Sequence, residues 1–368
     1  MGSIWGRQVK ISLFGESHGP GIGVVLDGLP AGEKIDLAEV ASFMARRAPG
    51  RTPWSTRRQE PDQPEILSGL YRGQTTGTPL AAVIYNRDRR SHDYESLAGV
   101  PRPGHADLTG QMRYRGANDP RGGGHFSGRL TAPLTFAGAV CSQILARKGT
   151  KIAAHIYSIG SICDHPVDPV APDQAALLNL KEKEFPVLAD EQGEAMAAAV
   201  EAARQEADSL GGSVEVLAWG YPAGIGDPMM GGLESVLASL YYAIPAVKGV
   251  SFGAGFDVCE RRGSVNNDSP VILEQSGQKC IRLRSNHAGG IDGGISNGMP
   301  IVARLAFKPT PSIGLEQETV DLTELTNTTV VVKGRHDPCL VPRAVPVVAA
   351  ATAVGLLDCY LVQYGKEG

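Results

Sequence analysis

Two histidines flanked by glycine are the first candidates for chemistry. His18 lies in Gly15-Glu16-Ser17-His18-Gly19, and His105 lies in Arg102-Pro103-Gly104-His105-Ala106-Asp107. Glycine lets a backbone approach a ligand closely, and an imidazole can act as acid or base near neutral pH. Ser17 and His18 do not form a nucleophile–base pair automatically, because adjacent side chains on an extended strand face opposite ways. Taken singly, each histidine fits a structural role at least as well as a catalytic one.

Three further segments combine glycine with polar side chains. Arg121–Arg129 contains Gly122-Gly123-Gly124 and precedes an expected helix, a place where backbone N–H groups can hold an anion. It lacks the Gly-Lys-Ser/Thr spacing of a P-loop and the strand and acidic residue of a dinucleotide-binding turn. Ser285–Gly298 has five glycines and could cradle a flat cofactor or simply turn tightly. Lys333–Cys339 places Arg335 two residues before Asp337, which on its own is typical of a solvated surface turn.

Arginine is concentrated in one part of the chain. Residues 46–129 contain 14 Arg and no Lys against 8 Asp and Glu, although the whole chain has a formal net charge of −4. Arginine binds phosphate and carboxylate through planar, bidentate contacts. The region is therefore either an anion-binding surface or an Arg-rich solvated loop region, and charge alone does not choose between them.

Composition excludes several classes of protein. The chain has 368 residues, of which 42% are hydrophobic, so it is globular, and its length alone is compatible with about two domains. The longest nearly unbroken apolar stretch, Val345–Leu357, contains Pro346 and is shorter than the ~18–20 residues of a membrane span. The first ten residues have no apolar signal-peptide core. Six cysteines without a Cys-x-x-Cys pair predict free thiols in a reducing, cytoplasmic compartment and no metal site.

The expected secondary structure predicts an α+β fold. Helices are expected from Asp36 to Met44, Thr131 to Arg147, Glu191 to Leu210, Leu233 to Ala243 and Arg343 to Val362. Strands are expected at 9–14, 24–26, 80–84, 213–219, 280–283, 300–307 and 329–333. The strands are not followed regularly by crossover helices, so antiparallel sheets with packed helices fit better than a doubly wound parallel sheet.

Taken jointly, the motifs are far more specific than any one of them. The chain closely resembles the chorismate synthase family through an ordered series covering nearly its whole length: Gly-Glu-Ser-His-Gly (15–19), Arg-Arg-x-Pro-Gly (46–50), Glu-Pro-Asp-Gln (60–63), Thr-Thr-Gly-Thr-Pro (75–79), Arg-Pro-Gly-His-Ala-Asp (102–107), Arg-Gly-Gly-Gly-x-x-Ser-Gly-Arg (121–129), Ser-Asn-His-Ala-Gly-Gly-Ile (285–291) and Gly-Arg-His-Asp-Pro-Cys (334–339).

The resemblance implies a fold and a reaction. The fold would be one catalytic domain over residues 1–368, with helices enclosed between antiparallel sheets, in a cytoplasmic homotetramer. The reaction would be the shikimate-pathway 1,4-elimination of phosphate from 5-enolpyruvylshikimate 3-phosphate, with loss of a ring C6 hydrogen, giving chorismate. It would require reduced FMN without net redox change. The flavin would be reduced externally, with NADPH as a possible reductant, and neither nucleic acid nor membrane would be a partner.

The resemblance also implies roles for residues. His18 would protonate the departing phosphate, His105 would lie against the flavin and stabilise its reduced form, and Asp337, with Ser17 nearby, would assist flavin N5 in taking the C6 proton. Substrate and flavin carry several anionic groups, for which Arg47, Arg102, Arg129 and Arg335 are the candidate ligands. The remaining implied FMN contacts are His125, Phe126, Ser127, Ala246, Gly293, Lys308, Pro309, Thr310, Pro311 and Ser312, together with Arg47 and Arg335.

Three positions depart from the family pattern. His125-Phe126 stands where many relatives have Arg-Ser, Pro53 stands where Arg is common, with Arg51 as a possible substitute, and Ala349 replaces a frequent Glu. These departures put individual ligand contacts in question, not the reaction. Two other functions would use the same residues. A flavin-dependent oxidoreductase would oxidise flavin at each turnover, and a non-catalytic anion or nucleic-acid binder would use the Arg-rich segment, although that segment lacks interleaved aromatics.

Overall fold

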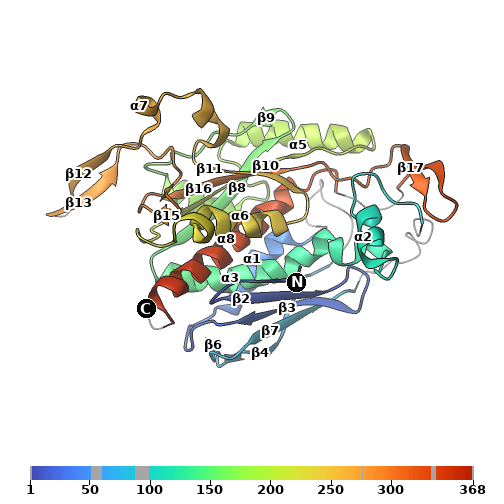
Figure 1. Cartoon of the computed structure of the whole chain (residues 1–368), viewed down its shortest axis with the longest axis horizontal. Coiled ribbons are helices and arrows are strands. Elements are labelled where there is room, and N and C mark those ends of the chain that lie inside the picture. Colours follow the sequence, from blue (N-terminus) through green and yellow to red (C-terminus); the bar gives the residue numbers. More distant parts are fainter. Residues whose placement is uncertain (1, 51–59, 88–98, 276, 333–336, 367–368) are drawn as a thin grey trace.

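Two antiparallel five-stranded sheets enclose a layer of helices (Figure 1). The computed structural model describes residues 2–50, 60–87, 99–275, 277–332 and 337–366. The first sheet has the order β1 (Ile4–Trp5), β2 (Lys10–Gly15), β3 (Gly21–Asp27), β7 (Leu80–Tyr85), β4 (Glu65–Ser68). The second has the order β11 (Val247–Phe252), β16 (Ile301–Phe307), β10 (Gly212–Trp219), β8 (Lys151–Ile159), β9 (Ile162–Cys163). The predicted α+β fold is confirmed.

The helices lie between the sheets, on the second sheet's outer face or at the ends. Their bounds are α1 Leu37–Arg47, α2 Asp107–Tyr114, α3 Thr131–Arg147, α4 Gln174–Asn179, α5 Asp190–Gln205, α6 Leu233–Ala243, α7 Gly263–Asn266 and α8 Val341–Tyr364. Short 3₁₀ turns are η2 Arg121–Phe126, η3 Gly128–Leu130, η4 Leu180–Glu182, η5 Met229–Gly231 and η6 Gly255–Glu260. Four two-stranded hairpins pair β5 (Leu70–Tyr71) with β6 (Gln74–Thr75), β12 (Pro270–Gln275) with β13 (Gln278–Leu283), β14 (Ile291–Asp292) with β15 (Ile295–Ser296), and β17 (Gln317–Asp321) with β18 (Thr326–Val330).

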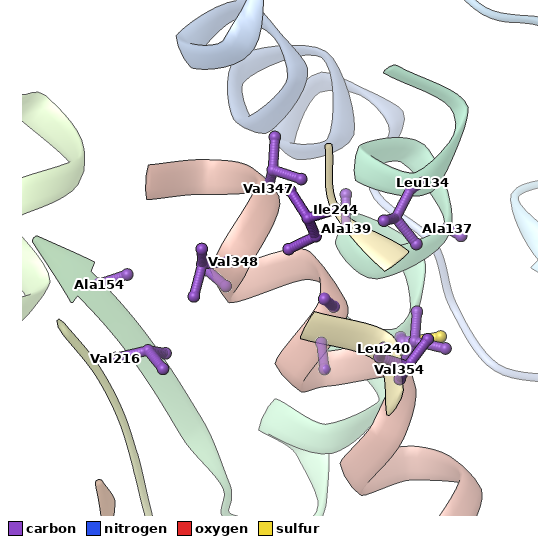
Figure 2. Packing of buried hydrophobic residues seen from close by; sticks show 14 of the residues in the cluster. Leu134, Ala137, Ala139, Ala154, Val216, Leu240, Ile244, Val347, Val348 and Val354 are labelled. Atoms are coloured by element: carbon purple, nitrogen blue, oxygen red, sulfur yellow. The ribbon is translucent and has the colours of Figure 1, made fainter. Parts of the chain in front are cut away.

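Helix α8 is the centre of the core. It is apolar on all sides, as a helix surrounded by protein must be, and it packs against α3, α6, β8 and β10 (Figures 1 and 2). Two glycines allow this close packing. A Cβ on Gly138 of α3 would overlap with Ala350 of α8, and a Cβ on Gly355 of α8 would come within 2.8 Å of Leu237 in α6.

Among the described residues, α8 is also the one helix long and apolar enough to cross a membrane. Its 24 residues exceed the apolar stretch considered in the sequence, because Pro346 is accommodated inside the helix. In its most apolar window, 89% of the residues are buried inside the protein. Burial in the core between the two sheets therefore explains the length and apolarity of this helix.

A buried carboxylate in α8 holds the beginning of the first sheet. Asp358 is fully buried, and its Oδ1 accepts hydrogen bonds from the backbone N–H groups of Arg7, Gln8 and Val9 at 3.0, 2.6 and 2.8 Å. These N–H groups would otherwise lack partners in the protein interior, which is costly. Asp358 thus links residues about 350 positions apart.

The predicted elements agree with the structure at most positions. Two predicted helices coincide with α3 and α6. The helix predicted to end at Leu210 ends at Gln205 instead, because Ala207 adopts a left-handed conformation and Asp208 N–H bonds to the carbonyl of Ala203. The strand predicted over 329–333 is β18, which is shifted towards the N-terminus by its pairing with β17. Strand β8, which pairs with the central strand β10 of the second sheet, was not predicted.

A buried ionic network lies on the second sheet. His155 of β8 donates from Nδ1 to Asp164 at 3.0 Å and from Nε2 to Glu215 of β10 at 3.1 Å. Glu215 also accepts from Arg304 of β16 at 2.7 Å, and Asp164 accepts from the N–H groups of Leu188 and Ala189. Since both ring nitrogens donate to carboxylates, His155 is an imidazolium, and the network contains two positive and two negative charges.

This network predicts a pH dependence of stability. Burial alone would lower the pKa of His155, but its hydrogen bonds to Asp164 and Glu215 raise it overall. The stabilisation is therefore complete below the ordinary histidine value of 6.5 and is lost as pH rises through the higher folded-state pKa. We expect His155→Gln to cost about 1.5–3 kcal/mol of unfolding free energy near pH 5.5, and clearly less near pH 9.

The measurement is urea denaturation of both proteins across this pH range. The pKa values of Asp164 and Glu215 are lowered, so their contribution is lost only as pH falls below the ordinary carboxyl values of 3.8 and 4.5. That loss lies outside the tested range. A cost of His155→Gln that stayed constant or grew towards pH 9 would contradict an imidazolium at this position.

Candidate active site

The segments that carry the motifs converge on one cavity of about 900 Å³. Its wall includes residues from β1, β2, α3, α6 and α8, and from the segments around 102–106, 122–131 and 307–312. The following predicted site residues line it: Ser17, His18, Arg47, Arg102, His105, His125, Phe126, Ser127, Arg129, Ala246, Lys308, Thr310, Pro311, Ser312 and Asp337. The sequence therefore identified residues that are far apart in the chain but share one site.

Two predicted residues do not line this cavity, and one cannot be placed. Pro309 is absent from the wall although its neighbours are present. Gly293 lies in the β14–β15 turn, in which its neighbour Gly294 packs against Asp227 and the beginning of α6, whereas Ala246 lies just beyond the other end of α6. Gly293 is therefore separated from the cavity residues within a single copy of the chain, and its contact with the cofactor stays a prediction. Arg335 and Pro53 lie outside the described residues.

Arg47 and Arg129 are both held by Asp62. Asp62 is buried, and one of its carboxylate oxygens pairs with Arg47 while the other accepts from Arg129 at 2.5 Å. Burial alone would raise the pKa of Asp62, but the two guanidinium groups lower it overall. Arg47 also donates to Thr131 Oγ1 at 3.1 Å and to the carbonyl of Gly128 at 3.1 Å. The carboxylate fixes two cations side by side at the cavity wall.

Arg129, which lines the cavity, has one guanidinium nitrogen without a hydrogen bond to any described residue. Its Nε donates to Asn86 at 2.6 Å and its Nη1 to Asp62, while its Nη2 lies 3.5 Å from Glu60 and has no hydrogen-bond partner among the described residues. A buried guanidinium nitrogen without a hydrogen bond is costly in a closed protein. Arg129 is therefore well placed to bind an anionic ligand.

Arg102, His105 and Asp107 form a compact unit. The Asp107 carboxylate accepts from Arg102 Nε at 2.7 Å, from Arg102 Nη2 at 2.9 Å and from His105 Nδ1 at 2.6 Å. Burial alone would raise the pKa of Asp107, but these hydrogen bonds lower it well below its usual range. Arg102 Nη1 extends to Ser312 Oγ at 3.1 Å. Much of Arg102's donor capacity is thus used to hold His105 and the 308–312 segment in place.

The three consecutive glycines are packed against the two histidines. Gly122, Gly123 and Gly124 all have positive φ, and the loop is a kinked 3₁₀ segment rather than a helix N-terminus. A Cβ on Gly122 would overlap with the His18 ring, and a Cβ on Gly123 would lie 3.0 Å from Cε1 of His105. The sequence suggested that this loop binds an anion through its N–H groups. In the structure its bare backbone supports both imidazoles.

This packing predicts the effect of Gly122→Ala. The added methyl group must displace the buried His18 ring, and we expect turnover to fall by roughly 10- to 100-fold, the scale of a misplaced catalytic group. Gly149→Ala is the matched control, because Gly149 also has positive φ but has open space around its Cβ position. Steady-state assays that showed the same modest change in both variants would attribute the effect to backbone strain alone.

His125 and Phe126 have structural contacts of their own. Because a carbonyl only accepts, His125 Nδ1 donates to Gly15 O at 2.8 Å, which leaves Nε2 to accept from Ser3 Oγ at 2.7 Å. Phe126 contacts Tyr114 and packs against Gly110, where a Cβ would come within 2.7 Å of its ring. His125 and Phe126 therefore place an imidazole and a phenyl ring in the cavity wall. The family pattern led us to expect Arg-Ser at these two positions in many relatives. Ala349, the other described departure, is buried in α8 and does not line the cavity.

The cavity fits a flavin and an anionic substrate together. Its volume is at the upper end of the ~300–1,000 Å³ typical of small-molecule sites. Its apolar wall, which suits an aromatic ring system, includes Leu13, Leu134, Ile244 and Val347. Five Arg or Lys side chains and one carboxylate, that of Asp337, are among its lining residues. Thr310 Oγ1 is buried in this wall without a hydrogen-bond partner among the described residues, so it can accept or donate to a ligand.

Asp337 is positioned by a residue that the sequence did not identify. It is buried and pairs with Nη1 of Arg343, the third residue of α8. Arg343 in turn donates from Nε to the carbonyl of Arg47 at 3.0 Å. Arg343, Asp62 and Asp107 are the main functional residues missed. Glu-Pro-Asp-Gln and Arg-Pro-Gly-His-Ala-Asp were recognised as motifs, so a carboxylate beside the arginines was the available signal.

The segment Ser285–Gly298 serves another purpose in a single copy. Asn286 and Asp268 hold it through hydrogen bonds to Gly290 N–H, His287 N–H and Ala288 N–H. None of its residues lines the cavity. Within the described part of the chain, no group of three or more His, Cys, Asp or Glu side chains could hold a metal ion.

The fold and the cavity together define an enzyme whose site combines cationic side chains, suited to a small anionic substrate, with an apolar wall. Comparison with known proteins identifies it further. The family model for chorismate synthase matches residues 9–361. The chain is 48% identical over 354 residues to chorismate synthase from Pyrococcus abyssi (strain GE5 / Orsay), covering 96% of both, and 44% identical over 364 residues to that from Thermococcus kodakarensis, covering 99% of both.

A solved structure agrees with the sequence relatives. A crystal structure of chorismate synthase superposes with a TM-score of 0.77 at 30% identity, covering 98% of this chain and 94% of the other. The chain belongs to the chorismate synthase family, whose members are lyases that eliminate phosphate.

Proposed function

We propose that this enzyme converts 5-enolpyruvylshikimate 3-phosphate to chorismate by 1,4-elimination of phosphate and loss of the C6 hydrogen, with reduced FMN bound beside the substrate. The observation that carries the proposal is the convergence of five cationic side chains and three histidines on one cavity with an apolar wall. Phosphate and carboxylate ligands require such cations, since each charge-assisted hydrogen bond contributes roughly 1.5–3 kcal/mol.

The proposed division of labour follows the groups available in the cavity. Arg129 binds an anionic group of the substrate, with Arg47 beside it. His18, buried next to Gly122, donates a proton to the departing phosphate. Asp337, fixed by Arg343, receives the proton that leaves C6. Ser17, also buried in the wall, orients the ligand through its hydroxyl.

The proposed flavin site consists of residues that line the cavity. They are His125, Phe126, Ser127, Ala246, Lys308, Thr310, Pro311 and Ser312. When bound, reduced FMN supplies an electron-rich ring that favours cleavage of the allylic C–O bond. Lys308 is held against the loop of His105 by a hydrogen bond from its Nζ to the carbonyl of Gly104. Burial lowers the pKa of Lys308 below its usual value, with Lys248 adding to the effect.

The direct test is an anaerobic assay of the purified chain with reduced FMN and 5-enolpyruvylshikimate 3-phosphate. We expect one chorismate and one phosphate per substrate, with no net oxidation of the flavin. Absence of chorismate under these conditions would refute the proposal. Stoichiometric flavin oxidation would point to an oxidoreductase instead. A second assay, with oxidised FMN and NADPH in place of reduced FMN, tests whether this chain reduces its own flavin. We expect no turnover in this second assay.

We also propose a cytoplasmic homotetramer in which residues 1–368 act as one catalytic domain. Exposed apolar side chains support association, among them Met230 on η5, Phe256 on η6, and Ile272 and Ile281, which are cross-strand partners on the β12–β13 hairpin. This hairpin extends away from the sandwich (Figure 1), and an isolated two-stranded hairpin is only marginally stable in water. Light scattering coupled to size-exclusion chromatography measures the mass. A monomer at micromolar concentration would contradict the assembly.

A further inference from the structure

We propose that Asp107 is a positioning residue that fixes the tautomer of His105, placing the proton on Nδ1 and leaving Nε2 available to the ligands in the cavity. The inference deepens the proposed function and rests on it for its catalytic consequence. The geometry that supports it is independent of any reaction, because it concerns which ring nitrogen can carry a proton.

The His105–Asp107 contact sets the tautomer. Nδ1 of His105 lies 2.6 Å from Oδ1 of Asp107. An ionised carboxylate only accepts, so Nδ1 must carry a proton at this distance. Asp107 stays ionised because the hydrogen bonds from Arg102 and His105 outweigh the effect of burial and keep its pKa well below the usual range. In the neutral ring, Nε2 is then the unprotonated nitrogen.

Arg102 cannot replace Asp107 in this role. Its Nη2 lies 3.1 Å from His105 Nδ1, but an N–H group cannot bond to a nitrogen that is itself donating. Nη2 instead donates to Asp107 Oδ1 at 2.9 Å, and Nε donates to Oδ2 at 2.7 Å. Arg102 therefore orients the carboxylate, and the carboxylate orients the imidazole.

The rest of the ring faces the site. His105 lines the cavity whereas Asp107 does not, so the Nδ1 edge points into the protein. At the other edge, Nη2 of Arg102 lies 3.4 Å from Nε2 and a Cβ on Gly123 would lie 3.1 Å from it, so an unprotonated Nε2 can accept from Arg102 or from a ligand in the cavity that His105 lines. Asp107 is also the first residue of α2, where the helix dipole further stabilises a negative charge.

Asp107→Asn tests the tautomer of His105 with little change in the shape of the side chain at position 107. The Asn oxygen can occupy the Oδ2 position, where it accepts from Arg102 N–H and Nε at 3.1 and 2.7 Å in the native protein. The amide NH2 then occupies the Oδ1 position and donates to Nδ1 of His105, so the proton moves to Nε2. This orientation places the amide NH2 against one donor, Arg102 Nη2, which is 2.9 Å from Oδ1 in the native protein. The reverse orientation would place it against two donors, Arg102 N–H and Nε, so the first is favoured and the His105 ring changes tautomer.

The test combines NMR with kinetics on the full chain. Ring ¹⁵N chemical shifts report the tautomer, and His105→Gln assigns the His105 signals. We expect Nδ1–H in the wild type and in Asp107→Glu, which keeps a carboxylate, and Nε2–H in Asp107→Asn. Turnover of Asp107→Asn should fall by about 10²-fold or more, with KM changed much less, and Asp107→Glu should recover a large part of the loss.

Asp268→Asn is the matched control. Asp268 lies 3.2 Å from Nδ1 of His287, and neither residue lines the cavity. We expect turnover of this variant within about twofold of the wild type, since it removes an Asp–His pair of similar chemistry away from the site.

The outcomes separate this inference from the proposed function. An unchanged His105 tautomer in folded Asp107→Asn would overturn the inference, even if activity fell, since a purely structural role lowers activity without moving the proton. Loss of the Nδ1–H tautomer in Asp107→Asn together with unchanged turnover would overturn its catalytic part. If the wild type made no chorismate while the tautomer switched as expected, the proposed function would fail and the assignment of Asp107 would stand.

Discussion

His18→Ala is expected to lower turnover by about 10²- to 10⁴-fold, the usual contribution of one positioned acid–base group. His18 is 5% exposed, lines the cavity and rests against the bare backbone of Gly122, so its ring is held in one place. Substrate affinity should change much less, because the cationic side chains that bind the anions remain. His105→Ala is expected to give a loss in the same range.

Single-turnover kinetics with reduced FMN separates the chemical step from product release. Addition of imidazole to His18→Ala provides a second measurement, since a small base can enter the space left by the ring. Near-normal turnover in His18→Ala would remove His18 from the mechanism. His165→Ala is a suitable control, because this histidine lies outside the cavity.

Asp62→Ala is expected to lower the free energy of unfolding by about 3–5 kcal/mol. The substitution leaves the guanidinium groups of Arg47 and Arg129 buried at 3% and 5% exposure without the carboxylate that pairs with both, and only Arg129 keeps a second carboxylate among the described residues, that of Glu60 at 3.5 Å. Repulsion between them would also displace Arg129, so substrate affinity should fall in the fraction that remains folded. Urea denaturation and a substrate titration measure the two effects.

The sign of the pH dependence provides a further check on Asp62. Its pKa in the folded protein is lower than the ordinary value of 3.8, so its stabilisation is complete above that value and is lost as pH falls through the folded-state pKa. The wild type and Asp62→Ala should therefore approach each other in stability only in strong acid. Glu201→Ala, which removes the partner of Arg204 on the surface of α5, should leave stability nearly unchanged. A cost below about 1 kcal/mol for Asp62→Ala would contradict the role of this pairing.

The sequence predicted the cavity residues better than the contacts that orient them. Motifs identified His18, His105, Arg47, Arg129 and Asp337, all of which meet in the structure. The role of Asp62 was not predictable from spacing, because it joins arginines 15 and 67 residues away through a left-handed backbone conformation that a non-glycine residue rarely adopts. Asp107 was within reach, since it follows His105 by two residues and begins a helix.

Elements were predicted where local patterns and tertiary packing agree. The Asp36 cap and the apolar periodicity mark the buried face of α1, Pro133 in the first turn indicated the beginning of α3, and the nearly uniform apolarity of α8 indicated burial. Strand β8 was missed because it is buried on both faces and contains His155, so it shows no alternation. The position of Gly293 relative to Ala246 depends on how a two-residue hairpin packs at one end of α6, which motif order does not specify.

The location of α8 has a consequence for how the polypeptide is made. The central helix of the layer between the sheets begins at Val341, so a ribosome must make almost the whole chain before that layer is complete. Strand β2 begins three residues after Arg7, and the backbone N–H of Arg7 can form its hydrogen bond only after Asp358 has been synthesised. During translation the first sheet can be covered by α3, which ends at Arg147, whereas β8 and β10 of the second sheet lack the α8 surface until the end of synthesis, and an incomplete core of this kind exposes apolar surface to chaperones.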